Sequence, residues 1–326
     1  MKTFWKDMIL ALLMGVALPS VMIPRLIVTE QSLQKRETQR VEMVTESTEQ
    51  EKTRRIILRL IDGTSAQMEL EEYLVGVVLA EMPAYFEEEA LRAQAVVART
   101  YTLRASATGG KHGDGSICTD SRCCQAYVSV MDYLERGGTG ESVDKVRSAV
   151  LDTSGQVLIY DGELIEATYF SCSGGLTEDA QAVWGTEYPY LKSVASPGEE
   201  NAAHFSDVVS FSFQELEKKL GIALSEKPDQ WFGAVTYTAG SGVKTIEIGG
   251  IEYTGTQLRN LLGLRSTMFD VVITEDSILF YTRGFGHRVG MSQYGADAMA
   301  ANGSTYKEIL AYYYQGTELT DIESVG

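Results

Sequence analysis

Glu81 has the position and the neighbours of a candidate general acid. Upstream of it, apolar residues at three-and-four spacing predict a helix with one buried face: Leu70, Tyr73, Leu74, Val77 and Val78. Pro83 ends this helix, because the residue before a proline is pushed away from helical angles. The carbonyl end of a helix disfavours negative charge by roughly 0.3–1 kcal/mol, and apolar neighbours add desolvation. Both effects raise the pKa of Glu81; a solvated glutamate at a helix end is the alternative.

Arg99 lies on an otherwise apolar stripe of a second predicted helix. This helix begins near residue 87, because the three successive glutamates at 87–89 are favoured by the positive end of a helix dipole. Leu91 and Ala95 share the stripe with Arg99, so the arginine is expected to be buried or aimed at a ligand. An ion pair with Arg99 would keep Glu81 ionised. We therefore expect Arg99 to hold substrate rather than to pair with the acid.

A glycine-rich loop carries four candidate metal ligands. They are His112, Cys118, Cys123 and Cys124. This composition suits a tetrahedral Cys3His zinc site, which would be structural because four protein ligands leave no open position for catalysis. The spacing H-x5-C-x4-C-C is not a common zinc-finger pattern. A Cys118–Cys123 disulfide outside the cytosol and free thiols are the alternatives.

Cys172 is a candidate nucleophile at the end of a predicted strand. It precedes Gly174 and Gly175, and His287 or His204 would have to act as its base. Neither histidine has an evident orienting partner in the sequence. We therefore interpret Cys172 as a small buried residue under a tight loop.

Two further stretches suit ligand binding. Tyr190 and Lys192 alternate along an extended piece and project to one face, which suits a sugar or an anion but equally an ordinary surface pair. Four glycines between positions 284 and 295 allow a tight path close to a ligand. His287, Ser292 and Gln293 lie on that path as it enters a helix, where polar groups can bind an oxygen-rich ligand. A sterically required turn is the alternative.

Composition and the N-terminus limit the class of protein. The chain has 326 residues, of which 44% are hydrophobic, and a net charge of −17 from 28 basic and 45 acidic residues. This balance argues against nucleic acid as a partner. Residues 8–23 form a low-charge apolar run, which is a signal peptide or, as we favour, an uncleaved membrane anchor within residues 1–28. Residues 29–55 read as a polar linker, and residues 56–326 as the folded domain.

The remaining patterns predict an α+β fold, in which mixed sheets surround a long central helix pair that carries the catalytic glutamate. Hairpins are expected around Asp62-Gly63, Asp161-Gly162 and Gly249-Gly250. Residues 132–149 read as a helix, and residues 201–233 as an amphipathic, acidic helical region.

Several unusual strings resemble a known family. They are VVLAEMPAYFEEEALRAQAVVARTY, ATYFSCSGG, YPYLKSVASP, GTQLRNLLGLRST and GFGHRVGMSQYGADAMA. Spread over about residues 56–319, they resemble the stage II sporulation protein D family of membrane-anchored peptidoglycan lytic transglycosylases, whose domain also occurs in amidase-enhancer proteins. The resemblance implies that Glu81 is the acid/base and that some members hold zinc in the cysteine-bearing loop. It implies substrate-side roles for Arg99, Tyr190 and Lys192, and we expect His287 and Gln293 to help position the glycan.

The resemblance also implies a reaction and a place. Glu81 would protonate the MurNAc–GlcNAc bond of denuded glycan, and the C6 hydroxyl of MurNAc would close a 1,6-anhydro ring. The domain would lie outside the cytoplasm, anchored in the membrane at the sporulation septum, and act in engulfment. Its partners would be the amidase stage II sporulation protein P and the membrane protein stage II sporulation protein M. A noncatalytic glycan-binding amidase enhancer and a Cys172 hydrolase are the competing interpretations.

Overall fold

The computed structural model describes residues 54–60, 63–107, 112–224 and 227–325. The chain divides into Met1–Arg54 and a compact unit, Arg55–Gly326, and only the second is described below. The predicted anchor at 1–28 and almost all of the predicted linker lie outside the described residues. Within the described ranges, none of the helices has both the length and the apolar composition that a membrane crossing requires.

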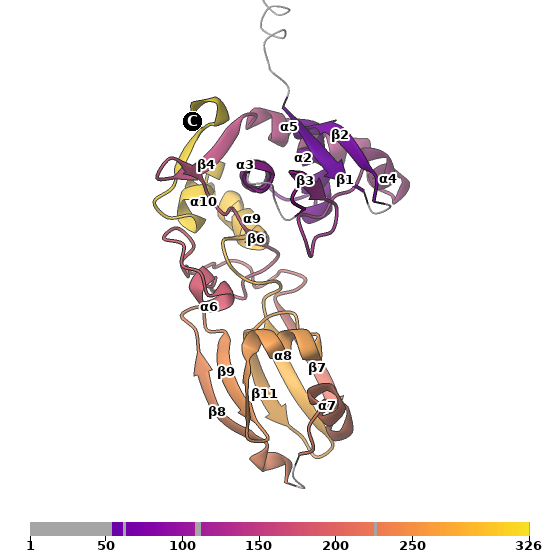
Figure 1. Ribbon diagram of the computed structural model, residues 1–326, viewed down its shortest axis with the longest axis vertical. Helices are drawn as coiled ribbons and strands as arrows, with labels where there is room; N and C mark the ends of the chain where they lie inside the picture. The colour runs from indigo at the N-terminus through magenta and orange to yellow at the C-terminus, as the bar shows by residue number, and fades with distance from the viewer. Residues whose placement is uncertain (1–53, 61–62, 108–111, 225–226, 326) are drawn as a thin grey trace, which may run out of the picture. The chain divides into compact units, whose positions relative to one another are not determined.

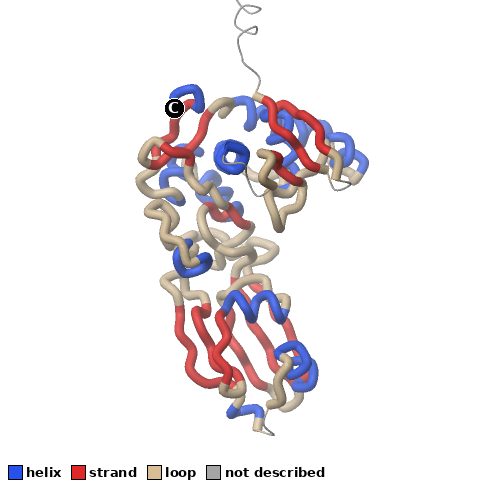
Figure 2. Tube along the Cα trace, viewed as in Figure 1, coloured by secondary structure: helices blue, strands red, loops and turns tan. Residues whose placement is uncertain are grey.

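The fold is α+β, as predicted: helices and small sheets alternate along the chain (Figures 1 and 2). The predicted central pair consists of α2 (Leu70–Glu81) and α3 (Glu88–Ala107), and both are confirmed. Most of α2 and the middle of α3 are buried in one large hydrophobic core. Two C-terminal helices, α9 (Gln293–Ala301) and α10 (Tyr306–Tyr313), pack against α3. The start and the end of the domain therefore meet around the helix pair.

Two three-stranded sheets flank this core. In the first, β1 (Arg55–Arg59) pairs antiparallel with β2 (Ser65–Glu69) and parallel with β3 (Ser116–Cys118), which confirms the first hairpin. The second has the order β14-β4-β5. Its strands are β14 (Glu318–Asp321), β4 (Gln156–Tyr160) and β5 (Glu163–Leu164). The tight turn at Asp161-Gly162 has positive φ at both residues and confirms the second predicted hairpin.

The helix predicted over residues 132–149 is two helices. α4 (Val130–Glu135) ends before Gly137, which has a φ of 94°. α5 (Gly140–Asp152) begins after Thr139, whose side chain accepts a hydrogen bond from the Ser142 backbone. The prediction joined them because a helical spacing continues across the glycines, whereas the left-handed conformation of Gly137 breaks the hydrogen-bond ladder.

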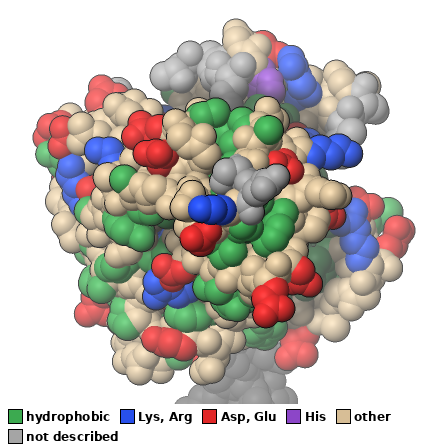
Figure 3. All heavy atoms as spheres, turned by 90° about the horizontal axis from the view of Figure 1, so that it is seen from below, with side chains coloured by type: hydrophobic (Ala, Val, Ile, Leu, Met, Phe, Trp, Pro, Cys, Tyr) green, Lys and Arg blue, Asp and Glu red, His purple; other side chains and the backbone are tan. Residues whose placement is uncertain are grey.

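Residues 206–283 form a lobe with a hydrophobic core of its own, here called the insertion lobe. Its strands are β7 (Ser206–Ser212), β8 (Phe232–Tyr237), β9 (Val243–Ile248), β10 (Ile251–Thr254), β11 (Phe269–Ile273) and β12 (Ser277–Arg283). Its helices are α7 (Phe213–Leu220), η1 (Pro228–Gln230) and α8 (Gly255–Leu262). The sheets have the orders β10-β9-β8 and β11-β12-β7. Acidic and basic side chains are interspersed with hydrophobic ones on the face that Figure 3 shows.

The sequence prediction for this lobe is partly confirmed. The hairpin at Gly249-Gly250 and the helix that follows it are present as β9, β10 and α8. The helical region predicted over residues 201–233 is wrong at β7, where an antiparallel strand pairs with β12 over its whole length. Phe211 is the one β7 residue in the buried class. Burial alternates along β7, but Asp207 occupies an inward position and Val208 an outward one, so the sequence lacks the apolar alternation that marks a half-buried strand.

The chain returns from the insertion lobe through residues 284–290. There Phe285 bridges to Cys172, and β13 (Met291–Ser292) pairs in parallel with β6 (Tyr169–Phe170). Gly290 permits this approach: a Cβ on it would lie 2.0 Å from the carbonyl oxygen of Thr168, and its φ is 86°. The C-terminus ends in η2 (Ile322–Ser324).

Candidate active site

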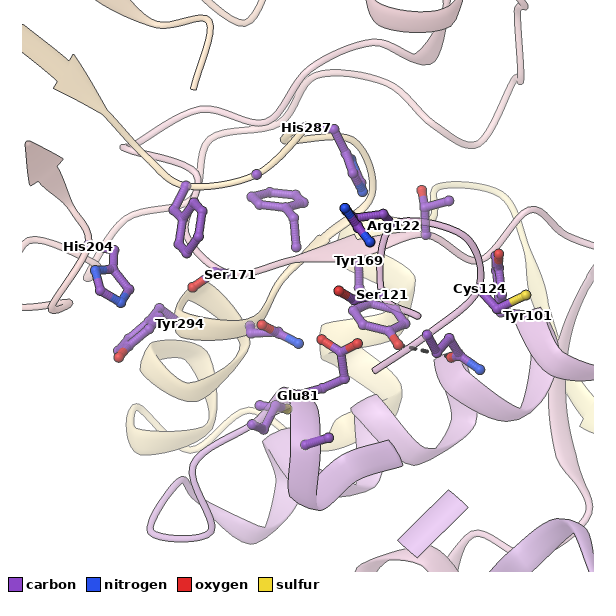
Figure 4. A pocket seen from close by; sticks show the side chains of 18 of the residues that line it. Glu81, Tyr101, Ser121, Arg122, Cys124, Tyr169, Ser171, His204, His287 and Tyr294 are labelled. Carbon is purple, nitrogen blue, oxygen red and sulfur yellow. Dashed lines mark hydrogen bonds between the residues drawn. The ribbon is translucent and has the colours of Figure 1, made fainter. Parts of the chain in front are cut away.

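A cavity of about 1130 Å³ opens at the end of α2. Its walls come from the end of α2, the cysteine-bearing loop, β6 with the residues before it, α6 (Ala180–Trp184), the loop at 285–287, the start of α9, and α8. Segments far apart in the sequence therefore converge on one space. Figure 4 shows Glu81 directed into it from below, with Tyr169 and His287 on the opposite side.

Glu81 is the last residue of α2 and is half-buried. The helix ends there as predicted, and the next residue, Met82, has extended backbone angles. Burial raises the pKa of Glu81 above its usual value. A backbone hydrogen bond from Ala126 to Oε1, at 2.8 Å, and the side chains of Gln293 and Tyr169 oppose this shift without cancelling it. The raised pKa favours the protonated form of Glu81, which is the form that a general acid uses.

A glycine in α2 allows the segment 126–128 to reach Glu81. A Cβ on Gly76 would lie 2.4 Å from the ring of Tyr127 and 2.6 Å from the carbonyl oxygen of Val128. The backbone of Val128 donates to the carbonyl oxygen of Gly76 at 3.2 Å, and Tyr127 stacks on Tyr73. This close approach at Gly76 brings the Ala126 N–H to the carboxylate of Glu81, which lies further along the same helix.

Tyr169 lies beside Glu81 on β6 and is part of a buried polar chain. Its hydroxyl donates to Oε1 of Gln125 at 2.9 Å, and Gln125 in turn donates to Oγ1 of Thr102 at 2.8 Å. Burial, and next the negative charge of Glu81, raise the pKa of Tyr169 well above its usual value. Tyr169 is therefore a neutral hydroxyl at any working pH.

His287 is in the cavity wall, as predicted. Its Nδ1 accepts a hydrogen bond from the Val289 backbone at 3.1 Å, so the neutral imidazole holds its proton on Nε2. Burial and the charge of Arg259 lower its pKa to about 4, although a hydrogen bond with the Tyr169 backbone acts in the opposite direction. His287 is thus uncharged at neutral pH, and its ring lies against Trp184, with 5.3 Å between the ring centroids.

Gln293 also lines the cavity, as predicted, at the first position of α9. It is 5% exposed, and within the described residues its Nε2 has no hydrogen-bond partner of good geometry. The preceding Ser292 is fully buried and caps α9 by accepting from the Gly295 backbone at 3.2 Å. Of this polar pair, Gln293 is the one available to a ligand.

The four predicted metal ligands lie together. Their donor atoms are all within 4.8 Å of one another. Nε2 of His112 is 3.8 Å from Sγ of Cys123 and 3.6 Å from Sγ of Cys124, and the two sulfurs are 4.0 Å apart. Zinc bound tetrahedrally at about 2.3 Å from sulfur and about 2.0 Å from nitrogen requires ligand separations of roughly 3.5–3.8 Å. The separations given for His112, Cys123 and Cys124 lie near this range, so the set suits zinc, and no disulfide joins the described cysteines.

The expected substrate-facing position of Arg99 is contradicted. Arg99 is completely buried and makes a two-pronged ion pair with Glu71, at 2.9 and 2.5 Å. Its remaining N–H groups donate to the backbone carbonyls of Gln156 and Val150. It is not among the described residues that line the cavity. The apolar stripe correctly indicated burial, but the partner is an acid from the first turn of α2.

Tyr190 and Lys192 are also placed differently from the prediction. Tyr190 is 5% exposed, and its hydroxyl accepts from the Glu166 backbone at 3.0 Å. Lys192 forms an exposed ion pair with Glu187 at 2.8 Å. Neither is among the cavity-lining residues that the structure describes. Lys192 matches the ordinary surface pair that the sequence left open, and Tyr190 supports the loop bearing Glu166.

Cys172 is fully buried and donates to Oε2 of Glu199 at 3.0 Å. Burial, and next the charge of Glu199, raise the pKa of its thiol strongly. A protonated thiol facing a carboxylate is a poor nucleophile. This environment agrees with the interpretation of Cys172 as a packing residue.

Sequence reasoning missed Tyr169, Trp184 and Arg259, which all line the cavity. Tyr169 and Arg259 lie in two strings that carried the family resemblance, but their spacing has no periodic or motif signal. Trp184 is in the five-residue helix α6 and is 41% exposed. A tryptophan in the sequence indicates a binding site only when the structure shows that its side chain faces a cavity.

Comparison with known proteins assigns the chain to a family. A family model described as "Stage II sporulation protein" matches residues 63–160. Stage II sporulation protein D of Bacillus subtilis (strain 168) is 39% identical over 273 residues, which cover 82% of this chain and 79% of that protein. The protein of the same name from Bacillus amyloliquefaciens is 37% identical. The "Amidase enhancer" of Bacillus subtilis is 29% identical and is covered over 40% of its length. With similarity this high over most of both chains, the protein belongs to the stage II sporulation protein D family.

Proposed function

We propose that this protein is a lytic transglycosylase that cleaves MurNAc–GlcNAc bonds of denuded peptidoglycan strands. The observation that carries the proposal is the state of Glu81. It is a carboxyl group at a helix end, half-buried in a large cavity, with a pKa raised by burial. Such a group can start the reaction as an acid and finish it as a base.

The cavity supports a mechanism with one carboxyl group. Ordinary glycosidases use two, one as acid and one as base or nucleophile. Among the described residues, the other carboxylate that lines the cavity is Glu166. Its Oε2 accepts from Nε of Arg104 at 3.0 Å. Glu166 is thus engaged in an ion pair, whereas Glu81 has no cation against it among the described residues.

The reaction balances without water. Protonated Glu81 gives its proton to the glycosidic oxygen as the bond from C1 of MurNAc to that oxygen breaks. Positive charge develops at C1, and the C6 hydroxyl of the same sugar forms a new bond to C1. The hydroxyl proton passes to the Glu81 carboxylate. The products are a 1,6-anhydro-MurNAc end and a free GlcNAc hydroxyl, and Glu81 is protonated again.

The surrounding residues orient the glycan. The Tyr169 hydroxyl and the unsatisfied Gln293 amide lie beside Glu81 and supply hydrogen bonds to sugar hydroxyls. Trp184 offers an exposed ring face beside neutral His287, which suits the apolar face of a pyranose. These contacts hold the scissile bond near Glu81. None of them places a charged side chain against the reacting C1 atom.

We also propose a structural zinc ion held by His112, Cys118, Cys123 and Cys124. Cys123 and Cys124 also line the cavity, so the ion would stiffen one wall of the site and would take no part in the bond-breaking steps. Cys118→Ser should lower bound zinc and thermal stability together. Purified protein without zinc, with Cys118→Ser equally stable, would remove this proposal.

Product analysis tests the reaction. The protein is incubated with denuded glycan, and the fragments are treated with borohydride and weighed by mass spectrometry. Anhydro ends lack a reducible group, so borohydride leaves their mass unchanged. Hydrolysed ends contain one more water (about 18 Da) and gain two hydrogens (about 2 Da) on reduction. Reducible MurNAc ends would show that water is the nucleophile and that a second carboxylate acts.

The cellular setting is proposed from the relatives' names and from the N-terminal apolar run. The domain would lie outside the cytoplasm, anchored by residues 1–28, and remodel septal peptidoglycan during engulfment in sporulation. The partners would be the amidase stage II sporulation protein P and the membrane protein stage II sporulation protein M. The similarity to an amidase enhancer supports one competing function, a noncatalytic glycan-binding module. That module would bind glycan equally well with Glu81→Gln and yield no anhydro ends in either form.

A further inference from the structure

Arg259 is a cation in the cavity wall for which the described residues provide no counter-ion. It lies on α8 of the insertion lobe and is half-buried. No ion pair or hydrogen bond of its guanidinium occurs within the part of the chain that the structure describes. Burial lowers its pKa, and no neighbouring acid offsets this shift. A guanidinium that is partly desolvated and has no hydrogen-bond acceptor is well suited to bind an anion.

The other charged groups in the cavity wall are compensated. Glu166 pairs with Arg104, and the exposed Arg122 pairs with Asp120 at 3.0 Å. His287 is uncharged at neutral pH, and Glu81 is neutral in the protonated form that starts the reaction. Arg259 is therefore the cation of the described cavity wall that lacks a counter-ion, although acidic residues outnumber basic ones by 45 to 28 in the chain.

The proposed substrate carries an anion near the bond that breaks. MurNAc bears a lactyl ether at C3, on the same ring as the C1 that is attacked. While a stem peptide is attached, the lactyl group ends in a neutral amide. Removal of the peptide converts this amide to a carboxylate. A planar guanidinium binds a carboxylate through two parallel hydrogen bonds, whereas an amide offers only one neutral oxygen.

We propose that Arg259 binds the lactyl carboxylate of MurNAc and thereby selects glycan from which the stem peptides have been removed. This inference rests on the proposed function, because it takes MurNAc as the sugar beside Glu81. It makes Arg259 a specificity-determining residue.

The test compares two ligands that differ only at this group. One is denuded glycan, and the other is the same glycan with its lactyl carboxylates converted to methylamides. Equilibrium binding is measured with Glu81→Gln protein, so that no turnover occurs, and with Arg259 intact or changed to Ala, Gln or Lys. Arg283→Ala is the control, because Arg283 is an exposed arginine of the same lobe outside the described cavity lining.

With Arg259 intact, the carboxylate glycan should bind roughly 10- to 100-fold more tightly than the methylamide, the range of a charged hydrogen-bonded pair. Arg259→Ala and Arg259→Gln should abolish this preference and leave methylamide binding unchanged. Lysine should restore only part of it, and Arg283→Ala should keep all of it. Equal weakening of both ligands, or a preference that survives in Arg259→Gln, would overturn the inference; the Gln variant decides if the Ala variant does not fold.

This readout separates the two proposals. If the unmutated protein forms no anhydro ends but still prefers the carboxylate through Arg259, the proposed reaction fails and the carboxylate site stands. If anhydro ends form and no preference exists, the reaction stands and the carboxylate site fails.

Discussion

Two glutamates in this domain have contrasting environments: Glu199 is placed to stabilise the fold, and Glu81 is placed to transfer a proton. Glu199 is 1% exposed and receives hydrogen bonds from five donors of the described chain. The donors are Sγ of Cys172, the backbone and hydroxyl of Ser173, the backbone of Gly174 and the hydroxyl of Ser196. Glu81 is less buried, faces a cavity and receives one backbone hydrogen bond, from Ala126.

The two carboxylates differ in how many hydrogen-bond donors the fold provides for them. The donors around Glu199 tie together the loop at 172–174 and Ser196, and Tyr313 of α10 extends this network through Ser196 at 2.6 Å. Around Glu81, desolvation outweighs the hydrogen bonds, so its pKa is raised. A carboxylate surrounded by donors holds loops together, whereas one that is desolvated and open to a cavity can hold and release a proton.

The largest expected effect is on cleavage by Glu81→Gln. Because the amide keeps the shape but cannot donate an acidic proton, we expect a loss of roughly 10²- to 10⁴-fold in the rate of glycan cleavage, with glycan binding retained in a pull-down. Glu166→Gln is the matched control in the same cavity and should retain most of the rate. If Glu166→Gln is as inactive as Glu81→Gln, the mechanism with a single carboxyl group is wrong.

Glu199→Ala should act on stability instead. It leaves several buried donors without an acceptor, and each unsatisfied group costs about 1–3 kcal/mol. We expect a loss of about 3 kcal/mol or more in the free energy of unfolding, measured by denaturant titration. A variant as stable as the unmutated protein, but inactive, would reverse the roles assigned to the two glutamates.

Substitutions of Cys172 test one donor in the hydrogen-bond network around Glu199. Cys172→Ala removes one donor and a small buried volume, so the free energy of unfolding should fall by about 1–2 kcal/mol. Cys172→Ser keeps a donor and should lose less. Glycan cleavage should be retained in both at temperatures below the melting transition. Loss of cleavage in a folded Cys172→Ala protein would restore the nucleophile hypothesis.

The smallest effect concerns the stability of Glu81→Gln. Since the folded state raises the pKa of Glu81, protonation favours the fold. The stabilisation is complete below the usual value near 4.5 and is lost as the pH rises through the raised pKa. The glutamine variant avoids this loss and should therefore be more stable than the unmutated protein at pH 7, with a higher Tm.

Thermal melts at several pH values measure this difference. The advantage of Glu81→Gln should shrink towards pH 4, where Glu81 of the unmutated protein is protonated in both its folded and its unfolded state. An advantage that is absent at pH 7, or that grows as the pH falls, would show that the pKa of Glu81 is not raised by burial.

Local patterns predicted much of the fold and part of the site. The helix break at Pro83, and with it the position of Glu81 at the end of α2, follows from the backbone restriction that proline imposes on its neighbours. The hairpins at Asp161-Gly162 and Gly249-Gly250 follow from two-residue turns that need positive φ. The grouping of His112 with three cysteines follows from their closeness in sequence. Each of these features is decided within a short stretch of chain.

The partners of long side chains were decided only by the tertiary structure. Arg99 and Arg259 are both arginines of amphipathic helices. Arg99 forms a buried ion pair with Glu71, whereas Arg259 has no acidic partner among the described residues and lines the cavity. Tyr169 reaches Glu81 because Gly290 lets β13 pair with β6. Helical spacing predicts which face of a helix is buried. It does not predict which residue of a distant segment packs against that face. That identity depends on how the helix pair, the return loop and the insertion lobe converge, and so does the difference between a structural ion pair and a binding site.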